Sequence, residues 1–186
     1  MGRVSQAQAQ QNRQQVVDAA ARLFRERGVQ GVGVAELMAA AGLTHGGFYK
    51  RFASKDALVA EATGRAFEEL GGRLDALDAG RPGDHAAARA ALVDYYLSAE
   101  HRDHPGDGCP AAALAADLAR EAPGSPAREP YADGVEAFGR WLATGDDEED
   151  LATLATLVGG VLLARATADT DLSDRILAAA RAAVER

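Results

Sequence analysis

The sequence predicts an all-α protein of about nine helices. Two observations lead to this fold class. Apolar residues recur every three to four positions along most of the chain, whereas no stretch alternates convincingly with period two. In addition, Ala, Leu, Arg and Glu dominate the composition, and all four are good helix formers. A length of 186 residues is sufficient for a small module joined to a larger helical body.

The first helix is expected over residues 12–27, and a short second helix follows Gly33. Gly28 stops the first helix, whose apolar positions share one face. Gly33 takes the N-cap position of the second helix, with Glu36 three residues later. This pair is a weakened capping box, because glycine lacks the hydroxyl that Ser or Thr would supply.

A third helix over residues 44–50 is expected after a tight turn at Gly42. The Thr44 hydroxyl can cap the amide of Gly46 or Gly47. Two short helices joined by such a turn, behind a packing helix, form a helix-turn-helix. Each of the two adjacent glycines costs roughly 1 kcal/mol relative to alanine in a helix interior. We therefore expect the backbone to approach DNA or the second helix closely here; tight packing of the third helix on the first is the alternative.

We call residues 1–55, which contain the helix-turn-helix, the head, and residues 56–186 the body. The body is also expected to be helical. Ser54 and Asp84 are the expected N-caps of the fourth and fifth helices. Pro110 opens the sixth helix at a position where proline is favoured.

Three more helices are expected toward the C-terminus. The seventh carries Phe138, the eighth follows the acidic run "TGDDEED" and begins near Leu151, and the ninth begins at Ser173. The segment "HRDHPGDG", residues 101–108, is expected to be a loop.

Charge is unevenly distributed along the chain. Residues 1–55 contain eight Lys and Arg against three Asp and Glu, a net charge of +5; the whole chain has −8, so residues 56–186 carry −13. Such asymmetry suggests that the basic end faces a polyanion, although ordinary solvated faces would also explain it.

Several protein classes are disfavoured by what the sequence lacks. A polar, glutamine-rich start and the absence of an apolar run of about 18 residues predict no signal peptide and no membrane partner. A single cysteine, Cys109, fits a cytoplasmic location. No glycine-rich nucleotide loop followed by Lys-Ser/Thr is present, so we expect no enzyme and no cofactor.

Residues 13–58 resemble the TetR family of bacterial transcriptional regulators. The most specific part is "AGLTHGGFYKRFASKDAL". Beyond residue 58, only the helix count and "HRDHPGDGCPAAALA" are similar to members of the family. Two departures stand out: Gly33 replaces the usual Thr or Ser cap, and Arg51 stands where histidine is common.

The resemblance implies a homodimer that binds palindromic double-stranded operator DNA. Tyr49 and Lys55 match phosphate-contacting positions of the family, and Thr44, His45 and Lys50 match positions that vary with the operator. The candidate DNA-binding residues are Gly33, Thr44, His45, Gly46, Gly47, Tyr49, Lys50, Arg51 and Lys55. Phe48 and Phe52 are expected to be core.

The last two helices are the expected dimer interface, as part of a four-helix arrangement. An intramolecular core is the alternative for the same apolar positions. The interface candidates are Leu151, Leu154, Val158, Leu162, Ile176, Ala180 and Val184.

The resemblance also implies a ligand pocket among the middle helices, with binding of a small-molecule inducer releasing the protein from DNA. Its apolar and aromatic lining predicts a largely apolar or aromatic ligand. The candidate lining residues are Tyr95, Tyr96, Cys109, Leu114, Phe138, Trp141 and Leu142.

Cys109 is a candidate sensor of oxidants or electrophiles. It precedes Pro110 at a helix N-terminus, where the dipole and a nearby imidazolium of His101 or His104 would favour the thiolate. An inert buried thiol is the alternative. The segment "HRDHPGDGC" also offers metal ligands, but such loops are usually solvated turns, so we expect no metal.

The combined expectation is a homodimeric repressor released from its operator by a small molecule or by modification of Cys109. An enzyme and an architectural DNA-binding protein are the competing classes. Turnover that depends on the body but not on Tyr49 would indicate the first, and many genomic sites without release by a ligand would indicate the second.

Overall fold

The computed structural model describes residues 6–145 and 148–185. Residues 1–5 of the polar start, and Asp146 and Asp147 of the acidic run before Leu151, lie outside this part. Within it the chain forms nine α-helices and two 3₁₀ turns and has no strand, so the predicted all-α fold is confirmed. The elements are α1 Gln6–Arg27, α2 Val34–Ala40, η1 His45–Gly47, α3 Lys55–Ala79, α4 His85–Tyr96, α5 Ala99–Asp103, η2 Pro105–Asp107, α6 Pro110–Arg120, α7 Arg128–Leu142, α8 Leu151–Ala166 and α9 Asp171–Val184.

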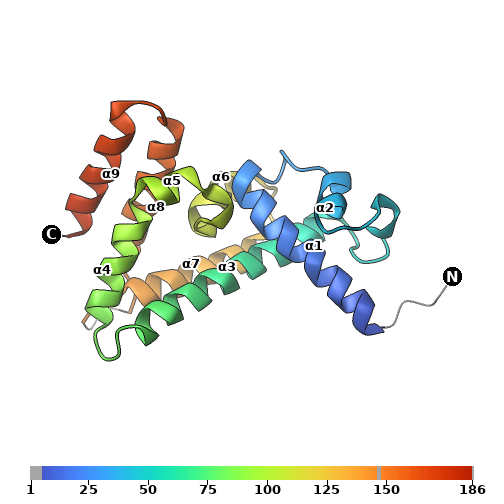
Figure 1. The fold of residues 1–186 in the computed structure, drawn as a ribbon, viewed down its shortest axis with the longest axis horizontal. Coiled ribbons are helices and arrows are strands. Elements are labelled where there is room, and N and C mark those ends of the chain that lie inside the picture. The colour runs from blue at the N-terminus through green and yellow to red at the C-terminus, as the bar shows by residue number, and fades with distance from the viewer. Residues whose placement is uncertain (1–5, 146–147, 186) are drawn as a thin grey trace.

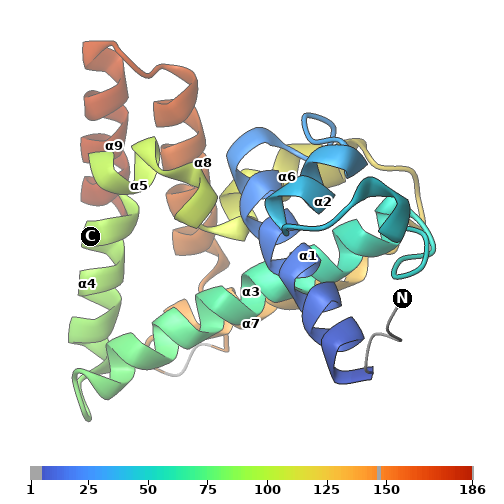
Figure 2. The same cartoon turned by 45° about the vertical axis from the view of Figure 1, so that its right-hand side comes forward.

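The molecule is elongated, with the head at one end and the body at the other (Figure 1). Helices α1 and α2 and the η1 turn form the head. The long helix α3 runs from beneath α1 to the far end of the body, and α7 lies along it. In Figure 2 the helices α8 and α9 stand side by side at the end opposite the head. None of the helices in the described part of the chain is long and apolar enough to span a bilayer.

The head is built around aromatic and aliphatic side chains from α1, α2 and Phe48, the residue that follows η1. Phe24, Leu37, Met38 and Phe48 are at most 1% exposed. Burial of each contributes on the order of 1.5–3 kcal/mol. Turns at Gly28 and Gly42 let the chain fold back over this core, since both adopt φ near +70° (75° and 69°), which glycine tolerates without strain. Phe48 and Phe52 are core, as predicted.

Helix α3 runs without interruption across the predicted boundary at residues 55/56. Its first half packs into the head core through Leu58 and Ala62, and Leu114 and Leu118 of α6 join the same cluster. The head and the body therefore share a helix and part of a core.

The predicted caps of the body helices are largely present. Ser54 Oγ accepts a hydrogen bond from the Ala57 amide (3.0 Å), and Asp84 Oδ1 accepts one from Ala87 (2.9 Å). Helix α1 begins at Gln6, six residues earlier than predicted.

Two predictions for the body are wrong. Residues 101–108 do not form an open loop: Ser98 caps the short helix α5, and the 3₁₀ turn η2 follows. Helix α9 begins at Asp171, so Ser173 lies within its first turn and not at its N-cap. Ser173 is fully buried, and its hydroxyl donates to the Ala164 carbonyl of α8 (2.8 Å).

Candidate functional site

The expected third helix is reduced to a single 3₁₀ turn, η1, followed by turns through Phe52. Thr44 occupies its N-cap position, but the Thr44 side chain makes no capping hydrogen bond. The expected hydroxyl cap is wrong because the Gly47 amide is already bonded to the main-chain carbonyl of Thr44 (3.1 Å). The turns are closed by amides of Arg51 and Phe52, which both donate to the Phe48 carbonyl.

The two adjacent glycines have different surroundings. A Cβ on Gly46 would meet no atom within 4 Å. A Cβ on Gly47 would lie 2.5 Å from Nη1 of Arg51 and 3.5 Å from Cε of Met38. A side chain at position 47 would displace the Arg51 guanidinium, whereas one at position 46 would displace nothing in the head. The open space over Gly46 is what close approach of a DNA backbone or base edge would require.

Polar side chains around this turn point away from the head core. Tyr49 is 73% exposed, and its ring rests edge-on against the buried ring of Phe48, with centroids 5.1 Å apart. A concave surface of about 600 Å³ lies between the start of α1 and η1. It is lined by Ala9, Thr44, Gly46, Gly47, Lys50 and Arg51. Five of the predicted DNA-binding residues therefore share one surface.

Two of the predicted cations also make internal bonds. Arg51 Nη1 donates to the Gly47 carbonyl (2.7 Å), and Lys55 Nζ donates to the Val29 carbonyl (2.7 Å). Lys55 therefore holds the α1–α2 connection in place, while its remaining two donors can reach a phosphate.

The predicted capping box of α2 is wrong. Gly33 does take the N-cap position, but Glu36 pairs with Arg27 (2.6 Å) on α1. This ion pair draws the carboxylate away from the amide of residue 33. Among the described residues Lys50 makes no ion pair, whereas Arg27 and other cations of α1 do.

The middle helices enclose a cavity of about 310 Å³ between α3, α4 and the α5–α6 connection. Of the predicted lining residues, Tyr95, Tyr96 and Cys109 border it. Leu70, Arg73, Leu77, Leu92 and His101 were not foreseen, together with Ala76 and Ala91. They come from helices α3, α4 and α5 and lie up to 31 positions apart in the sequence, so sequence spacing gave no signal for them.

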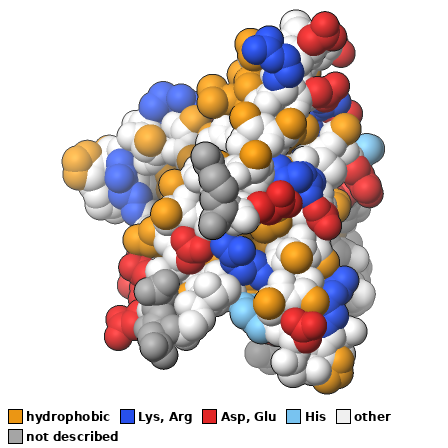
Figure 3. All heavy atoms as spheres, turned by 90° about the vertical axis from the view of Figure 1, so that its left-hand side faces the viewer, with side chains coloured by type: hydrophobic (Ala, Val, Ile, Leu, Met, Phe, Trp, Pro, Cys, Tyr) orange, Lys and Arg blue, Asp and Glu red, His pale blue; other side chains and the backbone are white. Residues whose placement is uncertain are grey.

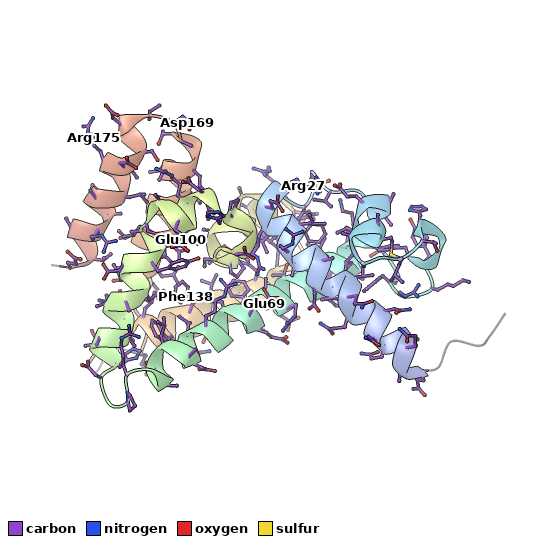
Figure 4. The ribbon with its side chains drawn as sticks, in the orientation of Figure 1. Arg27, Glu69, Glu100, Phe138, Asp169 and Arg175 are labelled. Carbon is purple, nitrogen blue, oxygen red and sulfur yellow. The ribbon has the colours of Figure 1, made fainter. Side chains whose placement is uncertain are left out.

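Four predicted lining residues lie elsewhere. Phe138 and Trp141 border a second hollow of about 220 Å³ on the other side of Leu70, and Figure 4 shows Phe138 on α7 inside the body. Trp141 Nε1 also donates to Asp78 (2.7 Å), which pins α7 to α3. Leu114 belongs to the head core, and Leu142 is fully buried in the body core. The predicted pocket was too wide because apolar residues fill the core and line cavities alike.

Beside the cavity, His101 connects the end of α4 to the start of α6. Its Nδ1 is 2.8 Å from the Tyr96 carbonyl, and its Nε2 is 3.0 Å from the Cys109 amide. Because an amide N–H donates to Nε2, the imidazole is neutral, with the proton on Nδ1. Burial lowers the pKa of His101 to about 4, a shift that the positive charges of Arg165 and Arg73 reinforce.

Of the two interpretations of Cys109, the structure favours the buried thiol over the thiolate. Burial raises the pKa of the Cys109 thiol, although contacts with Tyr96 and nearby amides of α6 oppose this rise. The neighbouring His101 carries no positive charge near neutral pH, and His104 is turned toward the Glu100 carbonyl (2.9 Å). Nor do the described residues bring three His, Cys, Asp or Glu side chains together as metal ligands.

The predicted interface positions of α8 and α9 differ in exposure within a single chain. Leu151 is 47% exposed and Leu154 is buried, whereas five further candidates are partly buried against the body core: Val158, Leu162, Ile176, Ala180 and Val184. Leu163 (59%) and Leu172 (46%) were not among the candidates but are exposed on the same two helices. Whether a second copy covers these residues stays a prediction.

The exposed turn over a buried aromatic core, in an all-helical chain with an interior cavity, defines a DNA-binding regulator of the helix-turn-helix class. Residues 16–62 match the family model described as "Bacterial regulatory proteins, tetR family". A segment of 97 residues is 34% identical to the HTH-type transcriptional regulator AcrR of Shigella flexneri. The segment covers 52% of this chain and 45% of AcrR. The chain thus spans about half the length of this curated relative.

Solved structures agree over nearly the whole fold. A TetR-family regulator from Agrobacterium tumefaciens superposes with a TM-score of 0.76 at 19% identity, covering 96% of this chain and 98% of its own. The reduced form of E. coli NemR superposes with a TM-score of 0.69 at 21% identity, covering 91% of this chain and 95% of NemR. RolR in complex with resorcinol gives 0.51 at 26% identity, covering 97% and 90%. The head thus matches the family model of TetR regulators over residues 16–62, and the whole fold is shared with solved TetR-family regulators.

Proposed function

We propose that this chain is a homodimeric repressor, which binds double-stranded operator DNA through residues 44–51 and is released when a small molecule occupies the body cavity. One observation carries the proposal: Gly46 is open to solvent within a surface where Thr44, Lys50 and the exposed Tyr49 surround it. A DNA strand can approach the backbone there and find hydroxyl and ammonium donors for its phosphates.

Dimerisation would use the outward faces of α8 and α9. One such head reads few base pairs, and two heads on a palindromic site read twice as many. Leu163 and Leu172 lie exposed among small residues of these helices, which a second copy would cover. Seen from the end of the body that carries α4 and α9, apolar side chains are interspersed with charged ones (Figure 3), a composition that suits an interface with a polar rim.

The connection between cavity and head supports a response to ligand. Arg25 of α1 is 5% exposed; its Nε donates to the Gly106 carbonyl of η2 (2.9 Å), and Nη2 pairs with Glu69 of α3 (2.8 Å). Figure 4 shows Glu69 on the stretch of α3 that passes the head. The α5–η2 segment joins His101 to Cys109 at the cavity wall. A ligand that displaces this segment would therefore act directly on α1.

A non-covalent ligand agrees better with the structure than modification of Cys109. Burial of the thiol and its raised pKa both disfavour the thiolate that electrophiles and oxidants attack. The aromatic cavity lining agrees with a small aromatic ligand, and the related structure of RolR holds resorcinol.

The test is fluorescence-anisotropy binding to the DNA upstream of the chain's own gene, as a function of salt. We expect tight binding whose logarithm falls steeply with the logarithm of salt concentration. A thiol-reactive electrophile should leave the DNA affinity unchanged in this titration, both for the wild type and for Cys109→Ser. Release of the wild type alone would instead make Cys109 the sensor. Failure to bind that DNA, followed by genome-wide mapping that finds no discrete sites, would contradict the repressor.

A further inference from the structure

The body cavity carries a polar group that the protein itself does not satisfy. Tyr96 is 1% exposed and borders the cavity, and its hydroxyl has no hydrogen-bond partner among the described residues. A buried hydroxyl without a partner is destabilising, and such groups are rare in folded proteins. An unused donor at the wall of an apolar cavity points to a ligand that supplies the acceptor.

The surroundings of Tyr96 offer its hydroxyl at most one weak partner within the protein. The ring packs against His101 (centroids 4.5 Å apart) and Phe138 (6.1 Å). Both nitrogens of His101 are occupied by the Tyr96 carbonyl and the Cys109 amide. Burial raises the pKa of Tyr96, and the nearby Cys109 thiol adds to this rise, but the thiol and the hydroxyl do not meet the geometry of a hydrogen bond. Sulfur would in any case be a weak acceptor.

The rest of the lining defines what else the ligand must be. Leu70, Leu77 and Leu92 with the rings of Tyr95 and Tyr96 give the cavity a largely apolar lining. Arg73 is the only charged residue among the lining residues, and no carboxylate borders the cavity. An ammonium group would therefore meet a like charge at the exposed Arg73 and find no carboxylate to pair with. A volume of about 310 Å³ is at the lower end for small-molecule pockets.

We infer that the cavity binds a small aromatic carbonyl compound, uncharged or anionic, whose carbonyl oxygen accepts a hydrogen bond from the Tyr96 hydroxyl. Because that hydroxyl is covered in the free protein, binding includes a small displacement of the Tyr96 or Cys109 side chain that turns the O–H toward the ligand. This inference rests on the proposed ligand-responsive function for its consequence, release from DNA, but binding itself is measured without DNA.

Three probes of nearly equal shape isolate the chemistry: acetophenone, ethylbenzene, which lacks the oxygen, and 1-phenylethylamine, which carries a positive charge. Isothermal titration calorimetry and ligand-observed NMR on the full chain should show acetophenone bound at least five-fold more tightly than ethylbenzene, with no binding of the amine. Equal binding of acetophenone and ethylbenzene, preference for the amine, or no binding of any probe would overturn the inference.

Two tyrosine variants provide the matched comparison. Tyr96→Phe should abolish the preference for acetophenone over ethylbenzene and raise the melting temperature, because an unpaired buried hydroxyl is lost. Tyr131→Phe removes a hydroxyl outside the cavity that does have a partner, the Ala111 carbonyl (2.7 Å). It should lower the melting temperature and keep the preference. If Tyr96→Phe keeps the preference, the inference is wrong.

The failure of this inference and that of the proposed function are distinguishable. A wild-type chain that discriminates among the probes but binds no DNA would refute the repressor and leave the cavity assignment standing. A chain that binds its DNA but does not discriminate among the probes would refute the cavity assignment and leave the repressor standing.

Discussion

The head and the body place their polar groups in opposite ways. In the head, Phe48 is fully buried and Tyr49, the next residue, is 73% exposed, so a packed core holds the candidate DNA contacts outward. In the body, the polar groups of Tyr96, His101 and Cys109 are turned inward around a cavity. A surface that binds a large polyanion needs exposed donors, whereas a site for a small apolar molecule needs enclosure. The difference therefore indicates which part of the chain addresses which partner.

The largest expected effect comes from separating two copies of the chain. Leu163→Arg places a charge on the exposed apolar face of α8 and should yield a monomer by analytical ultracentrifugation. Operator affinity should then fall by roughly 100-fold or more, because two linked heads gain that much over one. Ala79→Arg adds the same charge at an exposed alanine at the end of α3 and is the control. A Leu163→Arg protein that remains dimeric would place the interface elsewhere.

A smaller effect is expected at Gly46. Gly46→Val should leave the unfolding midpoint nearly unchanged, because its Cβ meets no atom within 4 Å in the free protein. Against DNA the added methyl groups should cost about 1.5–3 kcal/mol, a loss of roughly 10- to 100-fold in affinity by anisotropy. Gly72→Ala, an equally open glycine on α3, should bind DNA normally and stabilise the chain by about 0.5–1 kcal/mol. Normal DNA binding by Gly46→Val would show that the glycine serves another purpose.

The inward-facing polar groups of the body should make stability depend on acid. With the pKa of His101 at 6.5 when unfolded and about 4 when folded, the unfolded chain binds more protons between these values. The contribution of neutral His101 to the free energy of unfolding is complete above pH 6.5. It is lost as pH falls toward 4, by about 2 kcal/mol between pH 7 and pH 5.

Urea unfolding of wild type and His101→Gln at both pH values measures this contribution. The loss between pH 7 and pH 5 should be smaller in the variant. His85 acts with the opposite sign, because Asp78 raises its pKa, but it is present in both proteins and cancels. The same loss in both proteins would mean that His101 is not the group responsible.

The smallest effect is expected from one surface charge. Lys50→Ala should weaken operator binding by a few fold and reduce the slope of log affinity against log salt by about 1.8, since each phosphate contact contributes about 0.9 and a dimer has two. Anisotropy at four or more salt concentrations measures the slope. A loss of affinity that varies with operator sequence at an unchanged slope would assign Lys50 to base contacts instead.

Features that depend on neighbours in sequence were predictable, and features that depend on packing were not. Gly28, Gly42, Ser54 and Asp84 act locally and were identified correctly. The cavity was only partly foreseen, because Leu70 and His101 meet through the fold. For the apolar stripe of α8 and α9, periodicity identifies a covered side without saying whether the chain's own core or a second copy covers it.

The uninterrupted helix α3 has a consequence for how this architecture can change. At 1.5 Å per residue its 25 residues form a rod about 37 Å long that carries head core at one end and cavity wall at the other. Inserting one residue would turn the head by about 100° relative to the body. Heads with new operator preferences can therefore be exchanged within this helix only where the crossover keeps the number of residues unchanged. Substitution in the turn around Gly46 avoids this constraint, because it leaves the length of the rod constant.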